Sequence, residues 1–244
     1  MIVRSHDQHL LLVTQPDHAA LADTIMSDWQ LGGLADHPQR GAILFATHEH
    51  DSGWREADSR PSVDEESGRV LDFVNASLEI RQGIWPKSVL NAQSRPYAAA
   101  LVAQHALSLY ERYVEQPEWR PFFDRMTALR AKMLKRAAPL TLEGLRRDYG
   151  FLQIGDLASL TFCNGWKKPQ RVCGFELRLR GSRLTIVPDP FEGRDIPLAI
   201  QARRVQKRPY TSGPDLQRAL SAAPIVTLTG VASGHDTHPD RRGR

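Results

Sequence analysis

Two histidines and two aspartates have the residue types and the spacing that could bind a metal ion. His18 lies near the start of the chain, His50 and Asp51 are adjacent, and Asp156 follows much later. Imidazole and carboxylate groups are ligands of divalent iron, manganese and zinc. If these four residues converge, they predict a metal site.

Helical spacing places these groups, together with His105, on apolar helix faces, because residues three, four and seven apart share a face. His48 and Glu49 fall outside the inward arc. The apolar partners of His18 are Leu21, Ala22, Ile25 and Trp29; those of His50 and Asp51 are Ile43, Leu44 and Ala46; those of His105 are Leu101, Val102 and Leu109; and those of Asp156 are Leu145, Tyr149, Leu152 and Leu160.

The two aspartates indicate a metal more strongly than the histidines do. A single histidine on an apolar face is usually an ordinary core residue, whereas an ionised carboxylate among leucines costs several kcal/mol unless a cation or several donors compensate it. No lysine or arginine shares the apolar faces of Asp51 and Asp156. A divalent metal bound by imidazoles and carboxylates would satisfy all these groups together.

The elements that must position these residues are helices followed by strands. Residues 1–14 predict a hairpin, and residues 55–95 form a long polar stretch of the length often found in a functional lid or side wall. Apolar spacing predicts helices over residues 16–29, 96–115, 120–137 and about 142–162. Alternation then predicts strands between residues 172 and 231, interrupted by a short helix near residues 215–223. The expected fold class is α+β, with the C-terminal strands joining the hairpin in one antiparallel sheet.

Composition bounds the function class. The chain has 244 residues, 41% of them hydrophobic, a formal net charge of +4 and two cysteines, Cys163 and Cys173. No apolar run approaches the roughly 20 residues that cross a bilayer, and residues 1–13 do not resemble a secretory signal, so we expect no membrane and a cytoplasmic location. Nucleic acid is not favoured. The expected partner is a small anionic substrate, with a homodimer left open.

The order His18, His50-Asp51, Asp156 resembles the H…HD…D pattern of the HD superfamily of metal-dependent phosphohydrolases. HDSGW at residues 50–54 matches that superfamily's HD-x-G-K except that Trp54 replaces the lysine. The resemblance implies a helical bundle with its ligands on separate helices. We expect a single domain over residues 1–232, with an HD-like helical core at about 15–166 and a β-rich part at about 170–232 whose strands join the hairpin in a small antiparallel sheet. The polar residues 233–244 predict a disordered tail.

A closer resemblance covers nearly the whole chain. TQPDHAALA, HDSGWREAD, LVAQHALSLY and LQIGDLASL, in this order, resemble the bacterial domain-of-unknown-function 3891 family, which has no settled activity. Carried across from the HD superfamily, His18, His50, Asp51 and Asp156 would be metal ligands, and Asp51 could bridge two ions. His105 would be a further ligand or a base beside the metal. The implied cofactor is one or two ions of iron, manganese or zinc.

The neighbours of these motifs suggest a substrate pocket. Trp54, Arg55 and Asp58 follow His50-Asp51 directly, and Lys167 follows the helix of Asp156. Trp54, Arg55 and Asp58 could shape a pocket, and Lys167 could hold an anion. Each position also suits an ordinary surface or helix end. The expected function is hydrolysis of a small phosphoester or phosphoanhydride by a metal-activated water. The alternatives are a di-iron oxygenase, implied by oxygenases of the same superfamily, and a non-catalytic metal or small-ligand sensor.

Overall fold

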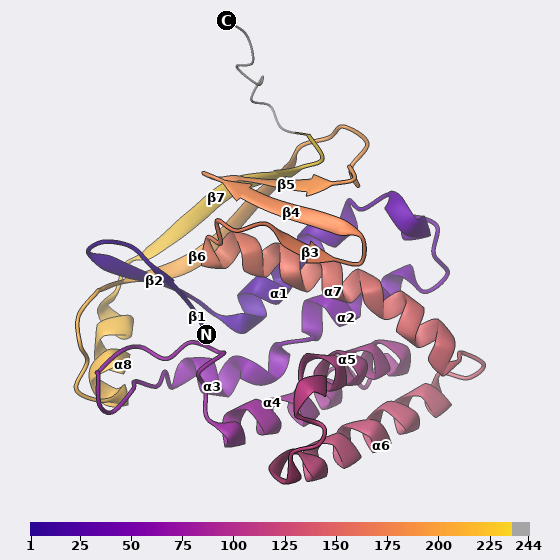
Figure 1. The fold of residues 1–244 in the computed structure, drawn as a ribbon, viewed down its shortest axis with the longest axis horizontal. Coiled ribbons are helices and arrows are strands. Elements are labelled where there is room, and N and C mark those ends of the chain that lie inside the picture. Colours follow the sequence, from indigo (N-terminus) through magenta and orange to yellow (C-terminus); the bar gives the residue numbers. More distant parts are fainter. Residues whose placement is uncertain (236–244) are drawn as a thin grey trace, which may run out of the picture.

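Most of the helices form one side of the molecule and a curled sheet forms the other (Figure 1). The computed structural model of the chain describes residues 1–235. The helices are α1 (Gln15–Ser27), α2 (Arg40–Glu49), α3 (Arg55–Ser59), α4 (Leu78–Asn91), α5 (Pro96–Leu109), α6 (Arg120–Arg136), α7 (Leu142–Asn164) and α8 (Gly213–Ala222). Within these described residues, no helix combines the length and the apolar character that crossing a membrane requires.

Side-chain caps define the N-terminal ends of α1 and α7, the helices of His18 and Asp156. Thr14 precedes α1 and its hydroxyl accepts a hydrogen bond from the backbone N–H of Asp17. Thr141 caps α7 in the same way, accepting from the N–H of Gly144. Gly165 follows the last residue of α7 and caps the helix, and its φ of 71° suits a residue without a side chain. The predicted helix over residues 142–162 is thereby confirmed, with two more residues at its end.

The sheet has seven strands, and β6 connects its two halves. The strands are β1 (Ile2–Ser5), β2 (His9–Val13), β3 (Gln170–Val172), β4 (Phe175–Arg180), β5 (Arg183–Val187), β6 (Ile196–Gln206) and β7 (Ile225–Ser233), in the spatial order β1-β2-β6-β7-β5-β4-β3. The C-terminal part of β6 pairs with β2, and its longer N-terminal part pairs with β7. Burial alternates along β6, so one face of the sheet packs on the core.

The predicted HD-like helical bundle with a small antiparallel sheet was wrong. The sheet is large and mixed, because β7 enters between β6 and β5 and runs antiparallel to the first and parallel to the second. Local alternation predicts each strand but not where a late strand enters the sheet, which depends on long-range pairing. The predicted tail at 233–244 begins inside β7, and its residues 236–244 lie outside the described part of the chain.

Helix α5 is the centre of the helical side. Every residue from Tyr97 to Leu107 is buried, and the helix packs against α2, α4, α6 and α7. A helix that is apolar all round is typical of such a central position. Helices α1 and α7 lie between α5 and the sheet, and Figure 1 shows the strands crossing over them. The candidate site residues thus lie between the central helix and the two helices beneath the sheet.

Candidate metal centre

Five side chains from four places in the fold lie close together, and we call them the His/Asp cluster. His18 comes from α1, His50 and Asp51 from the end of α2, His105 from α5 and Asp156 from α7. The Nε2 atom of His18 lies 2.9 Å from Asp51 Oδ2 and 3.8 Å from Asp156 Oδ1. The Nε2 atom of His50 lies 3.6 Å and 3.4 Å from the same two oxygens. His105 Nε2 lies 3.8 Å from Asp156 Oδ2.

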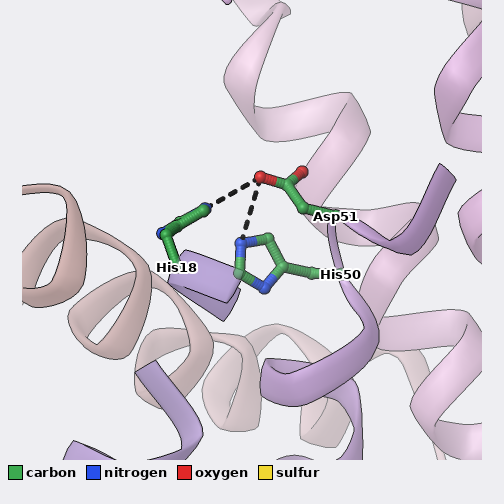
Figure 2. Close-up of side chains that lie close together, drawn as sticks. All are labelled: His18, His50 and Asp51. Atoms are coloured by element: carbon green, nitrogen blue, oxygen red, sulfur yellow. Dashed lines mark hydrogen bonds and ion pairs between the residues drawn. The ribbon is translucent and has the colours of Figure 1, made fainter. Parts of the chain in front are cut away.

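Each imidazole is oriented by the nitrogen that faces away from the carboxylates. His50 Nδ1 donates to the backbone carbonyl of Thr47 at 2.7 Å, so the proton must be on Nδ1. Ser159 Oγ donates its only proton to the carbonyl of Asp156, and it therefore accepts from Nδ1 of His18 at 2.8 Å. The Nε2 atoms of both rings then turn toward Asp51, as Figure 2 shows. Metal-binding histidines are commonly fixed through their second nitrogen in this way.

The third imidazole has its own partner. His105 Nδ1 lies 3.1 Å from the hydroxyl of Tyr149, and its ring meets the rings of His50 and Trp85 edge to face. Helix α7 supplies both Tyr149 and Asp156. The side chain of His105, which originates on α5, is therefore held between Trp85 of α4 and Tyr149 of α7.

Burial and charge act in opposite directions on the pKa values of the cluster. Burial acts to lower the pKa of His50, but the carboxylates of Asp51 and Asp156 outweigh it and raise the value to about 9. Burial acts to raise the pKa of Asp156, but the imidazoles lower it to about 2, and the pKa of Asp51 is lowered in the same way. Burial lowers the pKa of His105 to about 4. Two ionised carboxylates therefore lie next to the imidazolium of His50.

The cluster fits a cation. The Nε2 atom of His50 is buried and has no hydrogen-bond partner, and no lysine or arginine among residues 1–235 forms an ion pair with Asp51 or Asp156. Metal–nitrogen and metal–oxygen bonds of about 2.0–2.2 Å place two ligands of one ion about 3–4 Å apart, which is the separation observed here. The five residues form two overlapping triads that share His50, so the arrangement accommodates one ion or two.

The turn after His50-Asp51 is seated on α4 through its glycine. The N–H of Gly53 donates to Ser88 Oγ at 2.8 Å, and a Cβ at position 53 would lie only 2.0 Å from the backbone oxygen of Ile84. Trp54, the last residue of the HDSGW segment, is 3% exposed and packs in the core. The glycine of the HDSGW motif therefore has a steric role in holding the turn against α4.

A pocket of about 140 Å³ opens onto one side of the His/Asp cluster. Asp51, His105 and Asp156 line it, whereas His18 and His50 lie behind them and are fully buried. The remaining lining residues are Gln15, Trp54, Phe73, Val74, Arg81, Trp85, Leu109, Tyr110, Arg112 and Leu160. A small molecule in this pocket would meet both carboxylates and one imidazole.

The four residues predicted to form the substrate pocket have different positions. Trp54 lines the pocket. Asp58 is buried but does not line the pocket. Its carboxylate accepts a hydrogen bond from the backbone N–H of Gln15 and pairs with the amino group of Met1, so it holds the start of α1. Arg55 and Lys167 are exposed and do not line the pocket.

Several lining residues were missed because helix α4 was not predicted. Arg81 and Trp85 lie on α4, inside the polar stretch that was interpreted as a lid or side wall. Pro86 interrupts the pattern in the middle of this helix, and proline in a helix interior normally argues against a helix. The available signal was Ser77, which caps α4 by accepting from the N–H of Ile80.

Comparison with known proteins shows the family of the chain. Residues 1–207 match the family described as "Protein of unknown function (DUF3891)". No curated protein and no solved structure matches the chain. The match includes all five residues of the His/Asp cluster and ends after β6, before α8 and β7. Because it covers most of the chain, the protein belongs to the DUF3891 family.

Proposed function

We propose that the His/Asp cluster binds one or two divalent metal ions and that the protein hydrolyses a small phosphoester or phosphoanhydride. The observation that carries the proposal is the convergence of three imidazole Nε2 atoms and two carboxylates at a point open to a pocket. A divalent metal at such ligands lowers the pKa of water and stabilises phosphoryl oxygens. Iron, manganese and zinc all accept this donor set.

The histidines and the aspartates of the cluster have different roles in this proposal. His18 and His50 are held from behind by Ser159 and Thr47, so they fix the position of the ion without facing the pocket. Asp51 and Asp156 face the pocket and are ionised, because the imidazoles lower the pKa of both carboxyl groups. They supply the negative charge that holds the cation next to the substrate.

His105 acts as a further ligand in this proposal. Burial lowers its pKa to about 4, so the ring is neutral at pH 7 and needs to lose no proton before it binds a metal. A general base works best with a pKa near the operating pH, which favours the ligand role over the base role. The ring faces both Asp156 and the pocket.

The order of the ligands along the chain supports the phosphohydrolase chemistry by resemblance. His18, His50-Asp51 and Asp156 follow the H…HD…D order of the HD superfamily. The lysine of that pattern is replaced by Trp54, a buried wall of the pocket, so phosphate contacts would come from other residues. Arg81 and Arg112 are cations that line the same pocket.

The test is turnover of a panel of small phosphoesters and phosphoanhydrides by untagged protein loaded with manganese, iron or zinc. We expect hydrolysis with at least one metal, a loss of about 100-fold or more in the Asp156→Ala variant, and activity retained in Asp148→Asn. Asp148 is a matched control because it is a buried aspartate on the same helix that does not line the pocket. Stoichiometric metal with no hydrolysis across the panel would contradict the hydrolase and favour the sensor.

The donor set also favours a second candidate, an iron-dependent oxygenase. Histidines combined with carboxylates and an open side are the ligand pattern of non-haem iron enzymes that use dioxygen. Here three histidines and two aspartates surround the site, and the pocket supplies the open side. Oxygen consumption that requires iron and is absent from Asp156→Ala would select this candidate over the hydrolase.

A further inference from the structure

We infer that the substrate carries a second anionic group, a carboxylate or a phosphate, which Arg81 and Arg112 bind at the pocket, with a small apolar or aromatic body between that group and the His/Asp cluster. The inference rests on the proposed function for the reacting end of the molecule. The second anionic group is inferred from the two arginines, and the apolar body is inferred from the residues that line the pocket.

Arg81 is a cation without an anionic partner. Its side chain is half-buried on α4, its Nε atom is buried and makes no hydrogen bond, and its guanidinium group lies 5.6 Å from the Trp119 ring. No acidic residue among residues 1–235 pairs with it. Lys87, on the same helix, shows the usual arrangement, since its ammonium group lies 2.8 Å from a Glu56 carboxylate oxygen. An arginine held on an aromatic ring with unused donors is a typical anion-binding residue.

Arg112 reaches the same pocket from a different element. It lies on the 3₁₀ turn Glu111–Tyr113 that follows α5, and its guanidinium group is 4.8 Å from the Tyr113 ring. The rings of Tyr113 and Trp119 stack with their centroids 4.9 Å apart, so the guanidinium groups of Arg112 and Arg81 lie on one aromatic pair. Arg112 also has no ion pair within the described residues. Two like charges held together without a counter-ion favour binding of an anion.

Aromatic and apolar side chains make up most of the remaining pocket wall. Trp54, Phe73, Trp85, Tyr110 and Leu160 line it together with Asp51, His105, Asp156 and the two arginines, and Gln15 is a polar lining residue. The volume of about 140 Å³ is close to that of an engineered cavity, about 150 Å³, that binds benzene. The body of the substrate is therefore about the size of one ring or a short branched chain.

Arg55 provides a matched control for the two arginines. It follows the His50–Trp54 turn directly and is exposed, but it does not line the pocket. Replacing it removes one positive charge near the site without touching the inferred contacts. A general electrostatic effect would thus appear in Arg55→Gln, whereas a specific contact would not.

The experiment compares two hydrolysis-resistant probes by calorimetry on the metal-loaded full chain: 4-carboxybenzylphosphonate and 4-methylbenzylphosphonate. Charge-assisted hydrogen bonds to the carboxylate predict that the first binds about tenfold or more tightly. We expect this preference to be lost in Arg81→Gln and in Arg112→Gln and retained in Arg55→Gln. Circular dichroism and metal content check that each variant is folded. A third probe with a second phosphonate in place of the carboxylate shows which anion is preferred.

Equal binding of the two probes by the wild-type protein would overturn the inference, as would a preference that survives in both arginine variants. The metal content of the same samples separates this result from the proposed function. Without bound metal, an arginine-dependent preference would support the anion site while contradicting the metal centre. Bound metal and turnover without any preference would support the hydrolase and overturn the anion site.

Discussion

Helix α7 carries two buried aspartates, Asp148 and Asp156, whose surroundings differ. Asp148 is 3% exposed and Asp156 is 8% exposed, and each has a histidine within ion-pair distance. Burial, residue type and a nearby imidazole therefore do not distinguish the two positions. The number and kind of groups that face each carboxylate do.

Asp148 has ordinary protein donors. Its Oδ2 accepts from the Tyr97 hydroxyl at 2.7 Å. Its Oδ1 makes no hydrogen bond but lies 3.4 Å from His37 Nε2 and 3.7 Å from Arg147 Nε. One carboxylate is thus surrounded by a hydroxyl, an imidazole and a guanidinium group. Protein groups alone can account for this site.

The Asp156 carboxylate has neither a hydroxyl nor a guanidinium partner among the described residues. It faces three imidazoles and a second buried carboxylate, Asp51, and two of those imidazoles have Nδ1 protonated and committed elsewhere. No guanidinium or ammonium group of the described residues pairs with either carboxylate. Two neighbouring buried carboxylates without a guanidinium or ammonium partner, rather than burial itself, are what indicate a cation site.

The largest expected difference between the two aspartates is in metal affinity. Asp156→Asn removes a charged ligand and should weaken manganese binding by about 100-fold or more, beyond the 10–100-fold typical of changes to outer partners. Asp148→Asn should change the affinity less than about threefold. Titration in competition with a chromogenic chelator measures both values. Similar losses in the two variants would remove the distinction.

The pH dependence of metal binding should differ from that of a site whose ligands are already deprotonated. The carboxylates of Asp51 and Asp156 raise the pKa of His50 to about 9, so a metal must displace a proton from this ring at neutral pH. The apparent affinity should rise about tenfold per pH unit from pH 6 to 8 and level off above about 9. His105 and the two aspartates release no proton on metal binding between pH 6 and 8, because their pKa values are lowered. A flat profile would contradict the assignment of His50.

A smaller effect is expected from the hydroxyl behind His18. Ser159→Ala removes the acceptor of the Nδ1 proton and should weaken metal binding by about tenfold. Thr161→Val is the matched control, because the Thr161 hydroxyl is also buried on α7 but donates to the backbone carbonyl of Leu157. Equal affinities for Ser159→Ala and the wild type would show that this hydrogen bond does not orient the ring.

The smallest effect on the metal, and a clear one on stability, is expected at Tyr97. Tyr97→Phe removes the donor to Asp148 and leaves a buried carboxylate oxygen without its hydrogen bond, which costs about 1–3 kcal/mol. Urea denaturation of the metal-free protein measures this loss in the free energy of unfolding. Metal affinity should remain that of the wild type, and a tenfold change would mean that the two aspartates act as one network.

The sequence predicted inward-facing positions well where helical spacing determines them. His18, His105 and Asp156 each lie on a helix with a clear apolar face, and the structure brings all three together with His50 and Asp51. Their roles as metal ligands remain a prediction. The same spacing excluded His48, which is partly exposed and lies 3.4 Å from Asp23.

The parts that were missed depend on contacts distant in sequence. Pro86 lies in the interior of α4, so the sequence pattern of this segment argues against a helix, and tertiary packing outweighs it. The pocket residue Arg81 was missed together with this helix. The parallel pairing of β5 with β7 is likewise set by the position at which β7 enters the sheet. Neither feature follows from the period of apolar residues along one segment.

Elemental analysis of the protein, purified without a histidine tag, tests the central claim most directly. Wild-type protein and Asp148→Asn should each contain one or two equivalents of iron, manganese or zinc, and Asp156→Asn should contain less than about a tenth of that amount. Wild-type protein without stoichiometric metal, or equal metal in all three proteins, would contradict the proposal that the His/Asp cluster is a metal centre.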